Sequence, residues 1–402
     1  MSFLVNSFIF GNAALAGFYA TADGAGADVS DVQGVNASGT ITVPSAWNGR
    51  KARVGAGGRS SSNSTSVTIA MTKGGSQFDG AGASFGSGIT LNPGGATAHS
   101  APITLSTSDS FAFSGPVNNT NGSWSYIEVL PSGVRTAVVN RTSTFSVGTA
   151  FTDCEWNNEL VDDANFFTTG SPTVFTMPSD ISGLVRVTCG MELTSPGTEM
   201  GLLLTGGVSG NMEVDTTGSQ LCIMSPPLAR ANGTTVKASV RCQSATTMKV
   251  DANTFMAIEE LPSSLKYAIG RWNGNNSVAS GSTFQSVSPG SEDVDVGGWF
   301  TAGQDHFTVP SGVTRVRVGF FVKTSNTLGS AFGFGIFKNG SEHQLMPYNA
   351  ATNASVECVH GVSPPIECSP GDTFDFRART AAGSMAIVAD SFVWIEEVPD
   401  VT

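Results

Sequence analysis

Repeated carboxylates are the residues of this 402-residue chain that could most readily do chemistry. They occur as Glu128, as Glu259 with Glu260, and as Glu396 with Glu397. A pair of carboxylates can act as general acid and base on a glycosidic bond. Each set, however, follows an isoleucine and precedes a Leu-Pro or Val-Pro pair, so charged and apolar positions alternate. That pattern favours the solvent-facing side of a strand, or a contact between domains, over catalysis.

Acidic clusters precede three recurring prolines by about 15 residues. Calcium takes several oxygen ligands from one loop, which makes these clusters weak calcium candidates. Their spacing matches no known calcium loop, so we interpret them as solvated loops and predict no other cofactor. The calcium candidates are Asp162, Asp163, Asp293 and Asp295.

Other catalytic and metal-binding patterns are missing from the sequence. The four histidines are scattered and none pairs with a nucleophile motif such as GxSxG; no P-loop or GxGxxG motif occurs, and the six cysteines form no CxxC pair. We interpret most cysteines as small buried apolar residues and leave open whether Cys358 and Cys368 are bridged. The sequence therefore predicts a protein that is not an enzyme.

The amino-acid composition further limits the classes of protein to which this chain can belong. The net charge of −12, from 20 Lys and Arg against 32 Asp and Glu, disfavours a nucleic-acid binder. No run of 18 apolar residues occurs, so we expect no insertion into a membrane. Charged residues make up only 13%, while 48 Gly and 18 Pro accompany a hydrophobic content of 40%. This combination indicates a sizeable core built from many short strands and tight turns.

Four short motifs recur three times in the same order, which predicts three modules: 1–132, including an N-terminal docking segment, 133–263 and 264–402. The first motif ends in Pro-Ser, the second holds an arginine between apolar residues, the third begins with Ser, and the fourth contains the glutamates. The alternating second motif predicts a strand with one buried and one wet face. The copies are Ile41–Ser45, Phe175–Ser179 and Phe307–Ser311; Ala52–Val54, Val185–Val187 and Val316–Val318; Ser100–Ile103, Ser225–Leu228 and Ser363–Ile366; Ile127–Pro131, Ile258–Pro262 and Ile395–Pro399.

Short β-branched or aromatic runs between Gly, Ser and Asn clusters predict an all-β chain of three tandem antiparallel β-sandwich modules, each of the jelly-roll type. The third module resembles the C1q/tumour-necrosis-factor family through Phe307–Pro310, Phe337–Gly340, Pro370–Phe374 and Ser391–Ile395. The resemblance implies a ten-stranded sandwich, trimeric association and a binding role without catalysis. A pseudo-trimer of the three modules within one chain is the alternative to a homotrimer.

The tryptophans divide by position. Trp124 and Trp394 lie in predicted closing strands and are expected in the core. Trp156, Trp272 and Trp299 lie near the linkers, where we expect them to pack between domains; stacking on sugars is the alternative.

The segment Leu4–Gly11 resembles the short apolar start of tailed-phage fibre proteins, although Ser7 stands where proline is usual. The resemblance implies that Leu4, Val5, Phe8, Ile9 and Phe10 dock on other virion proteins; a first β-strand is the alternative. We therefore expect a virion structural protein, a tail or head fibre that attaches to a host surface glycan or protein. A capsid decoration or cement protein and a secreted lectin-like module are the alternatives.

Overall fold

The computed structural model describes residues 21–23, 40–43, 45–59, 67–81, 83–86, 95–114, 124–194, 200–207, 210–216, 220–242, 246–248, 253–281, 283–325, 332–341, 348–351, 358–380 and 385–399. This part of the chain is all-β, and its one helical element is the 3₁₀ turn η1 (Ser45–Trp47). No helix in these ranges reaches the length and hydrophobicity needed to cross a membrane.

The described residues of the predicted module 1 (1–132) form two antiparallel sheets. The first has the order β1-β9-β3-β6, with β7 also on β3, and the second has the order β2-β8-β4-β5. The strands are β1 (Thr21–Asp23), β2 (Thr40–Thr42), β3 (Lys51–Arg59), β4 (Val67–Lys73), β5 (Ala83–Gly86), β6 (Gly95–His99), β7 (Ile103–Thr104), β8 (Ser110–Ser114) and β9 (Trp124–Val129).

Module 2 (133–263) repeats this plan with the sheets β13-β10-β22-β15-β18, where β19 also pairs with β15, and β12-β20-β16-β17, where β14 also pairs with β20. A third pair joins β11 to β21. The strands are β10 (Thr136–Asn140), β11 (Phe145–Val147), β12 (Thr152–Asp153), β13 (Asn158–Asp162), β14 (Phe175–Thr176), β15 (Leu184–Glu192), β16 (Met200–Gly207), β17 (Gly210–Thr216), β18 (Gln220–Met224), β19 (Leu228–Ala229), β20 (Thr235–Cys242), β21 (Thr246–Met248) and β22 (Phe255–Glu260).

Module 3 (264–402) has the sheets β24-β34-β28-β35-β23-β26, with β31 and β32 on β28, and β25-β33-β29-β30, with β27 on β33. The strands are β23 (Tyr267–Arg271), β24 (Asn276–Val278), β25 (Gln285–Ser286), β26 (Ser291–Val296), β27 (His306–Thr308), β28 (Arg315–Ser325), β29 (Phe332–Lys338), β30 (Tyr348–Ala351), β31 (Cys358–Val362), β32 (Ile366–Glu367), β33 (Thr373–Thr380), β34 (Met385–Ile387) and β35 (Phe392–Glu397).

The connectivity is that of a jelly roll. In module 3 the first strand, β23, pairs with the last, β35, while β28 and β29 follow each other in sequence but lie in opposite sheets. Strands distant in sequence therefore close each sandwich. Within the described ranges, the strand-to-strand pairings of every sheet stay inside one module. The predicted all-β antiparallel jelly-roll class is confirmed.

The serine of the third motif has the same local role in each module. The Ser100, Ser225 and Ser363 hydroxyls accept the amide N–H of Val54, Val187 and Val318 at 2.9–3.0 Å. The serine amide in turn donates to the carbonyl of the same valine at 2.7–2.9 Å. A proline follows each serine within two residues and has no N–H to donate to the neighbouring strand. The serine hydroxyl gives the valine amide a hydrogen-bond partner at this point.

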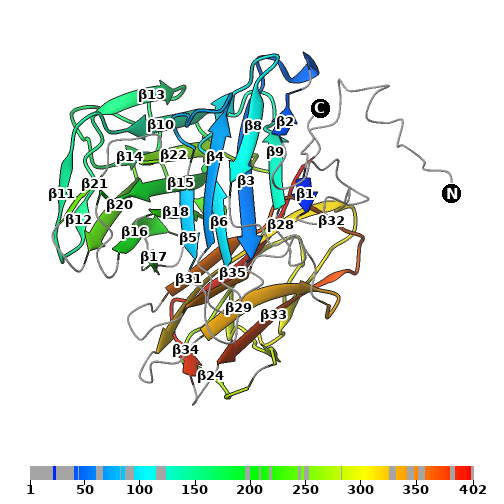
Figure 1. The fold of residues 1–402 in the computed structure, drawn as a ribbon. Coiled ribbons are helices and arrows are strands. Elements are labelled where there is room, and N and C mark those ends of the chain that lie inside the picture. The colour runs from blue at the N-terminus through cyan, green and yellow to red at the C-terminus, as the bar shows by residue number, and fades with distance from the viewer. Residues whose placement is uncertain are drawn as a thin grey trace.

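The modules surround a common axis instead of forming a linear rod. In Figure 1, module 1 (blue to cyan) stands in the centre, module 2 (green) lies beside it, and module 3 (yellow to red) lies below both. The sheets containing β9, β22 and β35 face inward, because arginines on β3, β15 and β28 of these sheets bond to glutamates on β22, β35 and β9 of the neighbouring modules. The described chain therefore adopts the intrachain pseudo-trimer left open by the sequence.

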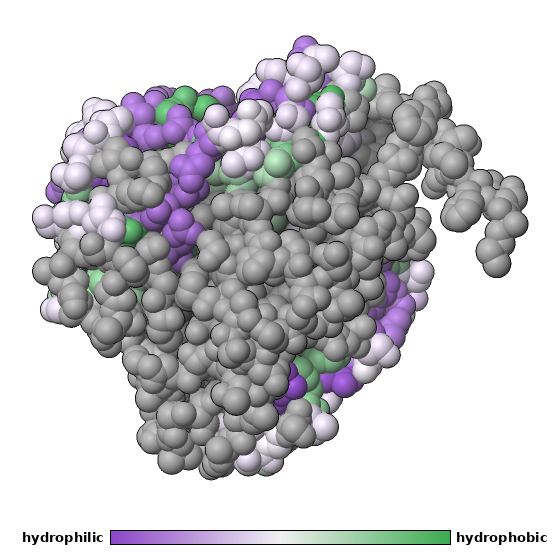
Figure 2. Space-filling view, in the orientation of Figure 1, coloured by the Kyte–Doolittle hydropathy of each residue, from purple (hydrophilic) through white to green (hydrophobic). Residues whose placement is uncertain are grey.

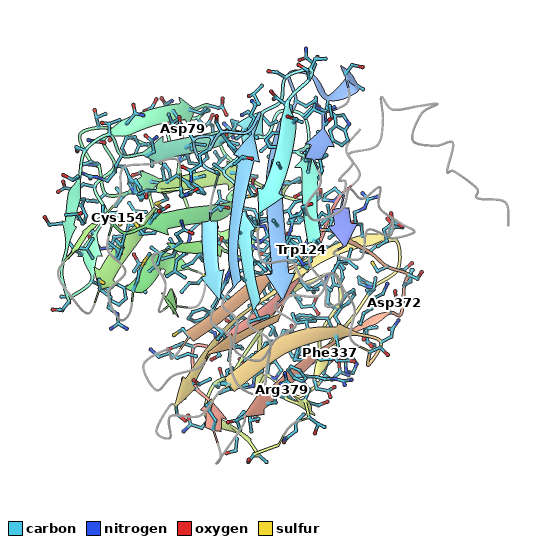
Figure 3. All side chains as sticks on the ribbon, viewed as in Figure 1. Asp79, Trp124, Cys154, Phe337, Asp372 and Arg379 are labelled. Carbon is cyan, nitrogen blue, oxygen red and sulfur yellow. The ribbon has the colours of Figure 1, made fainter. Side chains whose placement is uncertain are left out.

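Packing clusters cross the module boundaries. Trp124 and Tyr126 of module 1 belong to a cluster made otherwise of module 3, and Trp394 belongs to one made mainly of module 2. Figure 3 shows Trp124 where modules 1 and 3 meet. Trp156 and Trp272, in contrast, pack within their own modules. Trp124 and Trp394 are buried in packing clusters, as predicted, whereas the intermodule packing predicted for Trp156, Trp272 and Trp299 is wrong, because the closing strands form the intermodule surface.

The cysteines are free thiols. Five of the six are buried, and Cys368 is partly buried. Cys358 and Cys368 are not bridged in this structure. Burial raises the pKa of the Cys222 and Cys368 thiols to about 12, as expected of thiols surrounded by apolar groups.

Candidate functional site on the pseudo-threefold axis

The recurring arginine and glutamate motifs meet at one place in each module. Arg53 on β3 lies directly opposite Glu128 on β9, and the same register joins Arg186 to Glu259 and Arg317 to Glu396. Each arginine Nη1 donates to the glutamate of its own module, at 2.7 Å, 3.0 Å and 2.7 Å respectively. The second and fourth motifs are thus two halves of one ion pair.

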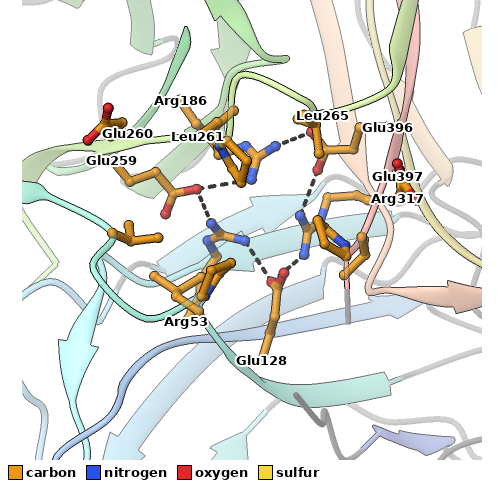
Figure 4. Close-up of a pocket in the computed structure, with 16 residues that line it drawn as sticks. Arg53, Glu128, Arg186, Glu259, Glu260, Leu261, Leu265, Arg317, Glu396 and Glu397 are labelled. Carbon is orange, nitrogen blue, oxygen red and sulfur yellow. Dashed lines mark hydrogen bonds and ion pairs between the residues drawn. The ribbon is translucent and has the colours of Figure 1, made fainter. Parts of the chain in front are cut away.

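These three ion pairs join into a closed ring of six charges (Figure 4). Arg53 Nη2 donates to Glu259 of module 2, and Arg186 Nη2 donates to Glu396 of module 3. Arg317 Nη2 donates to Glu128 of module 1 and closes the ring. Every arginine therefore bridges the carboxylate of its own module and that of the following module, which gives the arrangement its pseudo-threefold symmetry.

The ring is buried, so its charges depend on one another. Arg53, Arg186 and Arg317 are 0%, 3% and 1% exposed. Three positive and three negative charges cancel, and each carboxylate has two guanidinium partners, which offsets part of the desolvation cost. Glu259 Oε2 and the three arginine Nε atoms are buried without a hydrogen-bond partner. The predicted wet face of the arginine strands is wrong; of the two interpretations offered for the glutamates, the interdomain contact is the one found.

Each ring carboxylate is bonded to two guanidiniums, and Glu128 is a poor general acid. Burial by itself raises the pKa of Glu128, but the Arg317 and Arg53 guanidiniums outweigh this effect and hold the pKa below its ordinary value. A general acid needs a proton near neutral pH, and a general base needs a lone pair facing its substrate. Glu128 instead has a pKa held low by two guanidiniums, and Glu259 and Glu396 are each bonded to two as well. The ring is suited to joining modules.

Next to the ring, the residue two positions before each glutamate and the residue opposite it differ in size among the modules. Tyr126 and Trp394 occupy equivalent positions, and the residues opposite them are glycines. A Cβ on Gly55 would lie 2.3 Å from the Tyr126 ring, and one on Gly319 would lie 2.1 Å from the Trp394 ring. In module 2 the small and large positions are exchanged, because Ala257 lies opposite Thr188. The three modules thus share the ring but differ in this layer.

Further polar contacts hold module 2 to its neighbours. The Lys51 ammonium of module 1 pairs with Asp163. The backbone of His99 in module 1 binds the Cys222 thiol through both its N–H and its carbonyl, at 3.4 Å and 3.3 Å. In module 3, His360 Nε2 lies 3.1 Å from the Met224 carbonyl. No sequence motif marks these histidines, since they fall at non-equivalent positions of β6 and β31.

A small hollow opens at the end of the axis where the three closing strands stop. Its walls combine the six ring residues with Glu260, Glu397 and the Leu-Pro or Val-Pro pairs of the fourth motif, Leu130–Pro131, Leu261–Pro262 and Val398–Pro399. The fourth motif therefore forms one end of the axis in all three modules.

The calcium candidates lie in two separate pairs, and each carboxylate has protein partners. Asp162 accepts the backbone amides of residues 164, 166 and 167, and Asp295 accepts those of residues 298, 299 and 300. Asp163 pairs with Lys51 and Thr136, and Asp293 pairs with Arg271 at 2.7 Å. Among the described residues, no three His, Cys, Asp or Glu side chains are grouped as metal ligands.

The predicted docking residues Leu4, Val5, Phe8, Ile9 and Phe10 lie outside the described residues. Their role stays a prediction.

Comparison with known proteins places the chain in no family. No family model and no curated protein matches it. Among solved structures, murine APRIL aligns over 32% of this chain and 99% of its own, at 10% identity and a TM-score of 0.26. The CBM22 tandem of Paenibacillus barcinonensis Xyn10C aligns over 66% of this chain and 92% of its own, at 11% identity and a TM-score of 0.19. Similarities this low assign no function.

Proposed function

We propose that the chain is a non-enzymatic virion structural protein, a tail or head fibre whose three-lobed body takes part in host attachment. The observation that supports this proposal best is the closed Arg–Glu ring. It uses the three repeated carboxylates that could have done acid–base chemistry to lock three sandwiches into one rigid body. Rigid sheets that present loops are a common architecture for binding proteins.

The strand directions give this body two different ends. Strands β9, β22 and β35 all end at the ring, so the linkers after Pro131 and Pro262 start there. Strand β1 runs antiparallel to β9, from Thr21 opposite Tyr126 to Asp23 opposite Trp124. The chain therefore enters β1 from the side of the ring. In our proposal, the segment before β1 docks on the particle at the ring end, and the opposite end faces the host.

The pseudo-threefold axis lies within one chain, which limits the surfaces that the predicted homotrimer could use. All six ring positions are filled by a single chain, so a second copy finds no free position at this axis. A homotrimer would have to use other surfaces. In Figure 2, the coloured residues are mostly pale to purple, and the apolar ones lie in small separate groups. We therefore propose attachment as a single three-lobed body, with the homotrimer as an outcome to be tested.

A capsid decoration role is the second candidate. The pseudo-threefold body could sit on a local threefold position of a shell, where a cement protein contacts several neighbouring subunits. This role uses the same ring end for docking and needs no host ligand.

The test is to locate the chain on intact particles and then to remove its docking residues. We expect gold-labelled antibody to mark a tail or head appendage, and the variant Phe8→Asp/Phe10→Asp to leave particles without the protein. Glu397→Gln is the matched control and should stay attached. Purified body should compete with particles for adsorption to host cells. Particle association without competition would favour the decoration role, and absence from particles would refute both.

A further inference from the structure

Two buried histidines, one in each neighbouring module, lie against one strand of module 2. The backbone N–H and carbonyl of His99 in module 1 bond to the Cys222 thiol, and the His360 imidazole of module 3 lies against the Met224 carbonyl. Cys222 and Met224 both belong to β18, which packs against β6 of module 1. Strand β18 is thus the element of module 2 at which both neighbouring modules meet.

Both imidazoles are in surroundings that favour the neutral form. They are 0% and 4% exposed. His99 Nδ1 lies 2.8 Å from the Tyr126 hydroxyl, while its Nε2 is buried without a hydrogen-bond partner. His360 stacks on the Trp394 ring, with ring centroids 6.1 Å apart. The ionisable groups that face His99 are the Arg53, Arg186 and Arg317 guanidiniums of the ring, the Tyr126 hydroxyl, the Cys222 thiol and the His360 imidazole.

The ring carboxylates cannot readily compensate a new charge at His99. Glu128, Glu259 and Glu396 each already pair with two arginines. A protonated His99 would add a positive charge beside three guanidiniums and would carry N–H donors on both ring nitrogens, with no hydrogen-bond partner at Nε2. Burial, Arg317 and Arg53 accordingly lower the pKa of His99 well below its ordinary value.

We propose that His99 and His360 make the closure of the three lobes sensitive to acid: protonation of the two imidazoles opens both seams along β18 and releases module 2 from modules 1 and 3. The open form lets water solvate both imidazolium ions, which the closed form cannot do. This inference does not depend on the proposed virion role, because it rests only on contacts within the chain.

The direction of the pH dependence follows from linkage. Burial lowers the pKa of His360 to about 4, although the Met224 carbonyl opposes this. The open form has the ordinary value near 6.5, so it binds more protons below about pH 6.5. Closure is complete above that pH and weakens as the pH falls. His360 alone raises the ratio of open to closed forms on the order of a hundredfold between pH 7 and pH 4, and His99 acts in the same direction.

Buried thiols report where opening occurs. Cys222 lies at the seam with module 1, and Cys358 of module 3 packs in the cluster made mainly of module 2. Cys154 and Cys242 lie inside module 2, where their backbone amides donate to the carbonyls of Ala238 and Gly148. The full chain is labelled with 4,4′-dithiodipyridine between pH 7.5 and pH 4, with rates expressed relative to glutathione at the same pH and sites assigned by mass spectrometry. We expect Cys222 and Cys358 to accelerate about a hundredfold while Cys154 and Cys242 stay protected.

Variants separate the histidines from the carboxylates, which also titrate in acid. His99→Asn keeps a partner for the Tyr126 hydroxyl, and His360→Gln keeps a donor for the Met224 carbonyl, but neither can ionise. The double variant should lose most of the acceleration at Cys222, while the partly exposed control His306→Gln should behave as the parent protein. The proposal is overturned if the double variant accelerates like the parent, or if all cysteines react together. Should the double variant fold poorly at pH 7.5, a flat parent profile at Cys222 would overturn the proposal by itself.

Discussion

Removing one carboxylate from the ring should destabilise the chain far more than removing its neighbour on the same strand. Glu396 is 1% exposed and accepts hydrogen bonds from Arg186 and Arg317. Glu396→Gln leaves three arginines facing two carboxylates, so a net positive charge stays buried at the axis. Breaking a buried ion pair by removing one partner typically costs about 3–5 kcal/mol. Glu397 lies one position further along β35, at the edge of the hollow, and Glu397→Gln should cost about 0.5 kcal/mol or less.

The assay is urea unfolding followed by tryptophan fluorescence, because Trp394 is buried where modules 2 and 3 meet. The double variant Arg317→Met/Glu396→Gln supplies the decisive comparison. It leaves Glu128, Arg53, Glu259 and Arg186 as an open run of alternating charges with no net charge. We expect it to be more stable than Glu396→Gln alone. The reasoning fails if Glu396→Gln loses no more stability than Glu397→Gln, or if the double variant loses the sum of the two single losses.

Three further outcomes test the axis, the loops and the third motif. Gly319→Ala should lower the unfolding free energy by about 1–3 kcal/mol when Trp394 is present, and by much less in a Trp394→Ala background. A double-mutant cycle that shows no coupling between the two positions would contradict the close packing of Gly319 against the Trp394 ring. Because Asp162 and Asp295 accept backbone amides, millimolar calcium or EDTA should leave the melting temperature unchanged; a rise of several degrees with calcium would restore a metal site. Ser225→Ala should cost about 1–2 kcal/mol by leaving the Val187 amide unpaired, measured by denaturant unfolding against an exposed Ser→Ala substitution.

Local structure could be predicted from the sequence because each motif has a local physical cause. Lys338-Asn339-Gly340 forms a turn with positive φ at both Asn339 and Gly340, as the residue types require. In the turn after Pro370, Asp372 accepts the Ser369 amide at 2.9 Å. Both patterns are set by the backbone preferences of a few neighbouring residues, so the sequence shows them directly.

Burial at the axis could not be predicted in the same way. An arginine between apolar residues looks the same whether its face meets water or another module. What distinguishes Arg53, Arg186 and Arg317 is that each is matched, across the sheet and across the seam, by a glutamate that recurs with the same period. The joint repetition of Arg and Glu was therefore the available signal. Single strands were too short a unit to reveal it, because the ring needs three modules at once.

The covalent connection of the modules explains why the ring is uniform while the adjoining layer is not. Around a true threefold axis every layer contains three copies of one residue, so a position must be wholly large or wholly small. One chain is free of that constraint, and here Tyr126, Ala257 and Trp394 occupy the equivalent position, two residues before the ring glutamate, in the three modules. The charges have no such freedom, since an alternating ring closes without a net charge only if every module contributes one Arg and one Glu. Packing could therefore diverge among the modules, whereas the six charged positions had to stay the same.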